Sequence, residues 1–152
     1  MIKDIVVNLS ACVLFLLYLG AGAGHGFDQR QLKQLLTTNQ CPGCDLSAVN
    51  LSGANLFKAN LTGANLTGAF LSDANLAGAN LSKSNLSGAF LNDAYLANAD
   101  LTGANLTDAK MFFTILAGAN LSGTIFTRAK LSTALWFNGT RCAEGSVGGC
   151  EK

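Results

Sequence analysis

The side chains best suited to chemistry in this 152-residue sequence are those of its cysteines, five in all. Four of them form two close pairs, Cys41 with Cys44 and Cys142 with Cys150. The C-x-x-C spacing of the first pair serves thiol–disulfide exchange or supplies half of a zinc site. In an exported protein the same spacing also suits a disulfide staple. The surroundings of the two pairs must therefore decide among redox, metal and structural roles.

Residues for acid–base catalysis are scarce. Histidine occurs once, as His25, next to a predicted cleavage site. A mature chain would therefore lack both a serine–histidine triad and a histidine metal cluster. The sequence accordingly predicts no catalytic residue, no metal site and no cofactor.

Residues 1–23 have the order of an export signal, with a lysine near the start, an apolar run over residues 11–19 and small residues before the cleavage point. Ala21 and Ala23 fit the A-x-A pattern, which predicts cleavage after Ala23. An uncleaved segment would instead be the chain's membrane contact, since about 20 apolar residues can span a bilayer. Cleavage would remove Cys12 and leave an even number of cysteines, which favours disulfides.

A period of five residues runs without a slip from residue 44 to residue 138. Counting in steps of five from Leu46 to Trp136 gives nineteen large apolar centres. A small residue, usually Ala, lies two places before each centre, Asn or Asp commonly lies one place before it, and Gly is commonest two places after it. Neither an α-helix nor a flat strand keeps this pattern on one side, whereas a chain that turns a corner every five residues does. The pattern thus predicts a solenoid with Leu and Ala inside.

The A-N/D-L-x-G pattern over residues 44–138 resembles the pentapeptide-repeat family. The resemblance implies an all-β solenoid, a right-handed quadrilateral β-helix of about five coils with four pentapeptides in each. At about 4.8 Å per coil the rod would be about 24 Å long. The two cysteine pairs lie at its opposite ends, so one chain cannot bring all four cysteines around a metal ion. We therefore predict two local disulfides, Cys41 with Cys44 and Cys142 with Cys150.

A solenoid needs a cap at each end, because an open coil exposes its core and its unpaired backbone edge. Residues 24–43 are assigned to an N-terminal cap with a helix over residues 27–38, where apolar residues recur near helical spacing and Asp28 is available at the start. This helix is expected to be a lid on the first coil, and the alternative is a docking helix for a partner. Residues 139–152 are assigned to a C-terminal cap or tail, and Trp136 and Phe137 are expected to cover the last coil.

Residues twenty apart should stack on one face of a four-sided coil, so the outward positions form columns. Asn and Asp fill most columns, but two adjacent faces carry aromatic residues and lysines instead. Asp73 and Asp93 also stack there, although the open face expected at that point favours neither a cation site nor acid–base catalysis. The aromatic columns indicate either an interaction surface or coil-to-coil stacks that stabilise the rod. The candidate surface residues are Phe57, Phe70, Phe90, Tyr95, Lys110, Phe112, Phe113, Ile115 and Lys130.

The net charge of +1, with 12% charged residues, provides no field that would attract nucleic acid. We predict an exported, non-enzymatic structural or protein-interaction module that presents its outward aromatic faces to an unknown protein or envelope component. The alternative comes from the family, some of whose members mimic DNA and inhibit gyrase. Such mimicry needs a strongly acidic surface, and the acidic and basic residues of the repeat cancel.

An exported repeat that follows a C-x-x-C motif also resembles the pentapeptide proteins of cyanobacteria. The resemblance implies a location in a periplasm or a thylakoid lumen.

Overall fold

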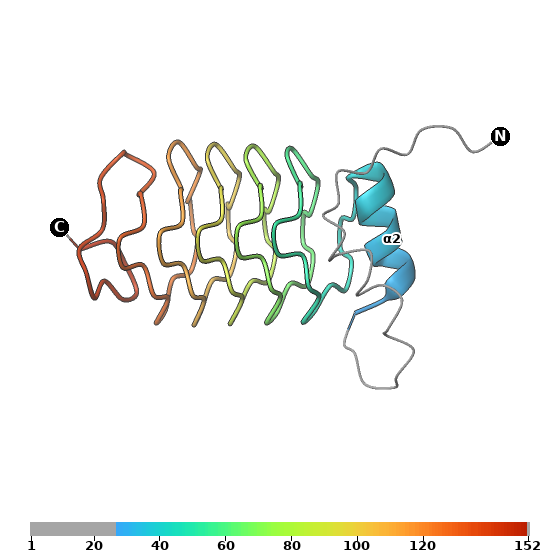
Figure 1. Ribbon diagram of the computed structural model, residues 1–152, viewed down its shortest axis with the longest axis horizontal. Helices are drawn as coiled ribbons and strands as arrows, with labels where there is room; N and C mark the ends of the chain where they lie inside the picture. The colour runs from blue at the N-terminus through green and yellow to red at the C-terminus, as the bar shows by residue number, and fades with distance from the viewer. Residues whose placement is uncertain (1–26, 152) are drawn as a thin grey trace.

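The computed structural model describes residues 27–151, which form a rod of stacked coils with a helix at one end (Figure 1). The predicted export signal and residues 24–26 of the predicted cap lie outside the described residues. Parallel β-bridges join residues twenty apart, from Gln40 with Asn60 to Ile115 with Leu135. They recur every five residues, so four pentads make one turn of a four-sided solenoid. Each bridge is a single residue pair, and the coils therefore contain short bridges in place of long strands.

We number the four sides by the inward centres that they contain. Face 1 contains Leu46, Leu66, Leu86, Leu106 and Phe126; face 2 contains Leu51, Leu71, Leu91, Met111 and Leu131; face 3 contains Leu56, Leu76, Leu96, Leu116 and Trp136; and face 4 contains Leu61, Leu81, Leu101 and Leu121. Faces 1 and 3 lie opposite each other, as do faces 2 and 4.

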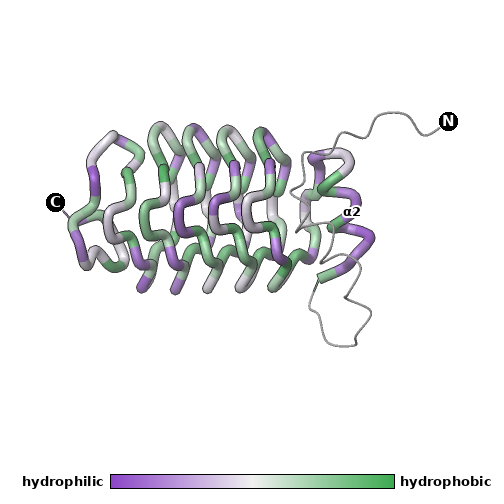
Figure 2. Tube along the Cα trace, in the orientation of Figure 1, coloured by the Kyte–Doolittle hydropathy of each residue, from purple (hydrophilic) through white to green (hydrophobic). Residues whose placement is uncertain are grey.

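The core consists of stacked Leu and Ala columns, as the period of five predicts. Every centre from Leu46 to Leu116 is buried, and hydrophobic and hydrophilic segments alternate along each coil (Figure 2). Ser84 and Thr114 replace Ala in the small columns, and their hydroxyls donate hydrogen bonds of 2.7 Å to backbone carbonyls. These bonds offset the cost of burying two hydroxyl groups.

Each corner of the coil is a turn that requires a left-handed residue. The carbonyl of each centre accepts a hydrogen bond from the N–H three residues later, as between Leu76 O and Ala79 N at 3.0 Å. The third residue of the turn has a positive φ, as in type II turns, which explains the repeated Gly. Phe113 and Thr133 nevertheless occupy this position, with φ of 58° and 60°. Side chains there cost about 1–2 kcal/mol, so both residues are locally strained.

Helix α2, Gln29–Thr38, packs against the first coil. It begins two residues later than predicted because Asp28, in extended conformation, is its N-cap and accepts a hydrogen bond from the N–H two residues on. Leu32 and Leu35 are buried, and Gln31 Oε1 accepts a hydrogen bond from Asp45 N at 2.6 Å. Within residues 27–151, no helix is both long enough and apolar enough to cross a membrane.

The bridge register begins before residue 44, the predicted start of the repeat. Gln40 bridges to Asn60, and Cys41 N donates to Asn60 O at 2.8 Å. Cys41 therefore occupies a centre position on face 4, and Cys44 occupies the small position that follows it. This pentad was not recognised in the sequence because its centre is a cysteine and not a leucine.

The chain beyond the last coil folds back along it. Antiparallel bridges join Lys130 to Val147 and Leu135 to Arg141, so the tail covers the edges of faces 2 and 3. Trp136 packs against Phe126 with ring centroids 5.1 Å apart. Phe137 was expected to help cover the coil, but it remains 46% exposed because the position after a centre points outward. The tail provides this cover instead.

Candidate functional site

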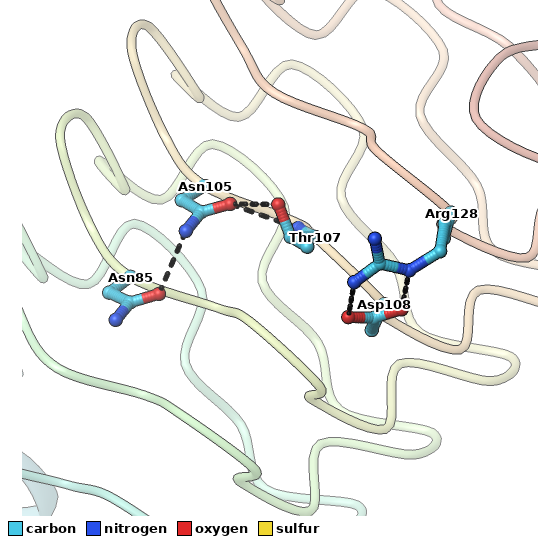
Figure 3. Close-up of polar contacts among 5 residues, drawn as sticks. All are labelled: Asn85, Asn105, Thr107, Asp108 and Arg128. Carbon is cyan, nitrogen blue, oxygen red and sulfur yellow. Dashed lines mark hydrogen bonds and ion pairs between the residues drawn. The ribbon is translucent and has the colours of Figure 1, made fainter.

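On faces 1 and 4 the outward Asn and Asp side chains are engaged by their own backbone. The side-chain oxygen of the residue before the centre accepts a hydrogen bond from the N–H two residues later, as in an Asx turn. Asn80 Oδ1, for example, accepts from Ser82 N at 3.0 Å and from Ser82 Oγ at 2.7 Å. Asn105 makes the same turn with Thr107 and also donates to Asn85 of the preceding coil at 3.4 Å (Figure 3). These side chains serve the fold.

The ion pair on face 1 is also structural. Arg128 Nε and Nη2 donate to the two carboxylate oxygens of Asp108 at 2.7 and 2.6 Å, across one coil step (Figure 3). The hydrogen bond from Arg128 holds the pKa of the Asp108 carboxyl below its usual value, and Asp108 raises the pKa of Arg128. Both groups therefore stay ionised at neutral pH, and an exposed pair of this kind adds little stability.

Face 2 carries a column that is both outward and self-supporting. Phe70 and Phe90 stack with ring centroids 4.8 Å apart and ring planes 11° from parallel. Lys110 Nζ lies 4.3 Å from the Phe90 ring centroid, and Lys130 follows in the next coil. The stacking distance equals the spacing of hydrogen-bonded strands, so the rings reinforce the coil ladder. Phe70 is still 43% exposed.

The other outward aromatics of face 2 are Phe112 and Phe113. Phe112 is half-buried, and its N–H donates to Asn92 Oδ1 of the preceding coil at 3.2 Å. Phe113 is 55% exposed and makes no ring or cation–π contact with any described residue. Its column neighbours are Asp93 and Thr133. Phe113 thus combines a strained backbone with a side chain that no other ring supports.

Face 3 is the most apolar side of the rod. Tyr95 and Phe57 are 51% and 48% exposed, Ile115 is half-buried, and Lys58 Nζ lies 5.2 Å from the Phe57 ring centroid. Sequence reasoning missed a second feature of this face, the residues directly after its centres. Faces 1 and 4 have Ser or Thr at that position in the repeat, whereas face 3 has Phe57, Ala77, Ala97, Ala117 and Phe137. This feature could have been found in the sequence, because the column of residues directly after the face 3 centres contains no Ser or Thr.

The nine predicted surface residues do not form one patch. Phe70, Phe90, Lys110 and Lys130 share one column of face 2. Phe112 and Phe113 lie beside this column, and Tyr95 and Ile115 lie on face 3 across the corner that follows Phe113. Phe57 stands apart in the first coil, since Asn75 and Ala77 occupy the next coil of its face.

The cysteines are joined in the two predicted pairs. The Cα atoms are 5.4 Å apart in Cys41–Cys44 and 4.8 Å apart in Cys142–Cys150. Cys41 and Cys44 are buried in the first coil, where a redox partner has no access to the sulfur atoms. Among residues 27–151, no three His, Cys, Asp or Glu residues are close enough together to hold a metal ion.

A family model and several solved structures relate this chain to known proteins. A family model described as pentapeptide repeats matches eight copies over residues 43–73, 74–111 and 105–134, more than half of the chain. A comparison with curated protein sequences finds no significant match.

Several solved structures are similar. QnrB1, a plasmid-mediated fluoroquinolone resistance protein solved as a trypsin-treated variant, has a TM-score of 0.56 and 20% identity over 61% of this chain. The match covers 48% of QnrB1, so this chain spans about half of that protein. The pentapeptide repeat protein Rfr23 from the cyanobacterium Cyanothece is 31% identical over 68% of this chain and 88% of its own, with a TM-score of 0.37. A pentapeptide repeat protein from the Arabidopsis thaliana thylakoid lumen is 26% identical over 87% of this chain and 92% of its own, with a TM-score of 0.39.

The likeness to QnrB1 supports the fold, and the structures of such repeats are right-handed quadrilateral β-helices. The repeat period, the coil of four pentads and the family model agree. This chain belongs to the pentapeptide-repeat family.

Proposed function

We propose that this protein is an exported, non-enzymatic interaction module that presents faces 2 and 3 of its rod to a protein or envelope component. In this proposal α2 and the C-terminal tail are lids that cover the two ends of the solenoid. The sides of the rod are then the surface that remains for docking.

The observation that carries this proposal is the segregation of exposed apolar side chains. Seven large hydrophobic residues are exposed in residues 27–151, and five of them lie on faces 2 and 3, namely Phe57, Phe70, Tyr95, Phe113 and Phe137. At Phe70 and Tyr95 an aromatic replaces the Asn of the Asx turn, so the backbone loses a local hydrogen bond worth about 1 kcal/mol. These five residues lie on two adjacent sides of the rod and do not form one patch, but exposed apolar side chains concentrated in this way are typical of an interaction surface.

A DNA-mimicking inhibitor is the less favoured function, because the rod lacks the acidic surface that mimicry requires. Between residues 45 and 140 the numbers of acidic and basic side chains are equal. The five acidic residues are Asp45, Asp73, Asp93, Asp100 and Asp108, and the five basic residues are Lys58, Lys83, Lys110, Arg128 and Lys130. The likeness to QnrB1 concerns the fold and adds nothing to the charge argument.

Replacing Phe113 with glycine tests the interaction surface. Glycine relieves the left-handed strain and removes an exposed ring without a ring partner, so the free energy of unfolding should rise by up to about 1 kcal/mol. Capture of the natural partner from an extract of the source organism should fall at least tenfold. Thermal melting and quantitative capture are measured on the same protein.

Lys83→Gly is the matched control. Lys83 has a φ of 58° at the equivalent turn position on the opposite face 4. Its replacement should give a similar change in stability with capture unchanged. If Phe113→Gly lowers stability and leaves capture intact, Phe113 is structural and the proposed surface is wrong.

Export is tested separately by the intact mass of the natural protein. Cleavage after Ala23 should leave a chain that begins at Gly24, because the small residues before that point fit a signal-peptidase site. A mass that corresponds to the full 152 residues would contradict cleavage.

A further inference from the structure

We propose that the last coil binds an extended peptide segment of a partner protein, which adds to faces 1 and 4 as a further β-strand. This inference goes beyond the proposed function, because it assigns a second docking site to the end of the rod and not to its sides. The site is the backbone edge of residues 119–126.

The C-terminal tail shows how a strand pairs with this edge. On face 2, Leu131 N donates to Ser146 O at 2.9 Å, and Ala129 O accepts a hydrogen bond from Gly148 N at 2.9 Å. The centre and the small residue of face 3 are paired with the tail in the same way. A strand on this edge therefore accepts from the N–H of a centre and donates to the carbonyl of the small residue two places before it.

The equivalent backbone groups of faces 1 and 4 have no hydrogen-bond partner among residues 27–151. On face 1 they are Phe126 N and Thr124 O, and on face 4 they are Leu121 N and Ala119 O. In the coils before the last one, groups at these positions pair with the coil that follows. Half of the last coil is therefore an open sheet edge.

The tail does not reach these groups because it turns back on itself. After Gly148, Cys150 is joined to Cys142 by a disulfide, and Glu151 O accepts a hydrogen bond from Ala143 N at 2.8 Å. The tail is the loop at the end of the rod opposite α2 (Figure 1). Its crosslink holds it over faces 2 and 3 and leaves the other two faces open.

The core is also less well covered on the open half of the last coil. Leu131, which lies under the tail, is fully buried. Leu121 and Phe126 occupy the same inward position on faces 4 and 1 and are only partly buried, and Ile125 is 49% exposed. An added strand would cover these apolar side chains and satisfy the backbone groups beside them.

The open edge lacks the features that natural proteins use to block strand addition, which are commonly lysine, proline or a bulge. Residues 119–127 contain no charged residue and no proline. The next residue, Arg128, directs its guanidinium group toward Asp108 of the preceding coil, with hydrogen bonds of 2.7 and 2.6 Å. A strand can therefore approach this edge without meeting an unpaired charge or a missing donor.

The arrangement of the open groups identifies the ligand as an extended polypeptide. A donor and an acceptor lie on either side of each outward residue, and an extended backbone carries the complementary pair at the same spacing. Alternate side chains of the added strand would point inward over Leu121 and Phe126, so they should be apolar. The tail follows the same alternation, with Ser146 buried and Val147 51% exposed.

The test uses nuclear magnetic resonance of the full chain with a synthetic peptide, acetyl-Thr-Val-Thr-Val-Thr-amide, whose valines would point inward. Without peptide, the amide protons of Leu121 and Phe126 should exchange with solvent at least tenfold faster than those of Leu131 and Trp136, which the tail protects. The peptide should slow the exchange of Leu121 and Phe126 alone. Its Kd should be about 1 mM, because few contacts hold so short a ligand.

Two methylated peptides test the hydrogen bonds. Methylation of the valine nitrogens removes the N–H groups that face the edge, so it should abolish the protection. Methylation of the threonine nitrogens alters N–H groups that face the solvent, so it should leave the Kd within about threefold of the original value.

Ile125→Lys tests the position of the site on face 1. Ile125 would lie opposite the central threonine, and a lysine there removes an apolar cross-strand contact, so the Kd for face 1 should rise about threefold. Ser87→Lys is the matched control, because it adds the same charge to face 1 two coils away from the edge. The Ser87 hydroxyl makes no hydrogen bond with a described residue, so this variant should bind and melt like the natural sequence.

Protection of Leu121 and Phe126 without peptide would mean that another part of this chain covers the edge. Protection that increases with protein concentration would assign the edge to a second copy. Either result would overturn the proposal, and so would unchanged exchange at about 5 mM peptide or protection by the valine-methylated peptide. Phe113→Gly should leave peptide binding unchanged, so the site at the end of the rod and the proposed surface on its sides can fail independently.

Discussion

Replacing Leu81 with aspartate should abolish the cooperative unfolding of the rod. Leu81 is fully buried in the centre column of face 4, where Leu61 and Leu101 lie directly below and above it. A carboxylate at this point would have no cation partner, and uncompensated burial of this kind costs more than about 4 kcal/mol. That loss is comparable to the total stability of a small domain. Far-UV circular dichroism during heating measures the loss of structure.

The neighbouring residue supplies the control. Asn80 points outward and accepts two hydrogen bonds from Ser82. Asn80→Ser keeps a hydroxyl oxygen near these donors, so its cost should stay within about 1 kcal/mol. Equal destabilisation by the two variants would contradict the inward and outward assignment of the columns.

Removing the disulfide Cys142–Cys150 should free the C-terminal tail and lower the stability of the last coil. The crosslink closes a short loop, and its loss as Cys142→Ser with Cys150→Ser should cost roughly 2.5 kcal/mol on the loop-entropy model. Without the crosslink, the backbone hydrogen bonds between the tail and the last coil should be weaker. One of them is the hydrogen bond of 2.9 Å from Cys142 N to Ala134 O. Thermal melting gives the stability, and limited proteolysis detects release of the tail.

The disulfide in the first coil should behave differently, because its cysteines occupy repeat positions. Changing Cys41 to Leu and Cys44 to Ala restores the residues that most other pentads have there. The added apolar burial, about 0.8 kcal/mol for each methylene, offsets the lost crosslink, and the net change should stay within about 1 kcal/mol. Equal losses in the free energy of unfolding for the two double variants would contradict this prediction. They would mean that the contribution of a disulfide does not depend on whether its cysteines occupy repeat positions.

The body of the rod was predictable because one period encodes it directly. Leu, Ala and the left-handed turn recur every five residues, and a chain that turns a corner at each repeat keeps the apolar residues inside. This period predicted the solenoid, whereas the coil of four pentads, and with it the columns that join Phe70 to Phe90, followed from the resemblance to the pentapeptide-repeat family. Cys41 escaped detection because a cysteine at a centre breaks the letter pattern without breaking the packing.

The ends and the surface were less predictable because the period of five residues does not encode them. The tail pairs with the last coil through backbone groups, as at Val147, and such bonds leave no signature in side chains. Asp28 as a cap was recognisable, since capping depends on the side chain itself. Whether an outward ring stacks or stands free depends on its neighbours in three dimensions, which is why Phe90 and Phe113 looked equivalent in the sequence and differ in the structure.

The single-residue bridges also limit how this protein can change in length. Since the coils pair residues twenty positions apart, gain or loss of a whole coil would leave all four surfaces in phase. Gain or loss of one pentad between Tyr95 and Ile115 would preserve the buried leucines yet rotate everything downstream by a quarter turn. These two residues would then belong to different sides, although the rod would be as well packed as before. Length variants of this rod can therefore be folded correctly and still carry a scrambled surface.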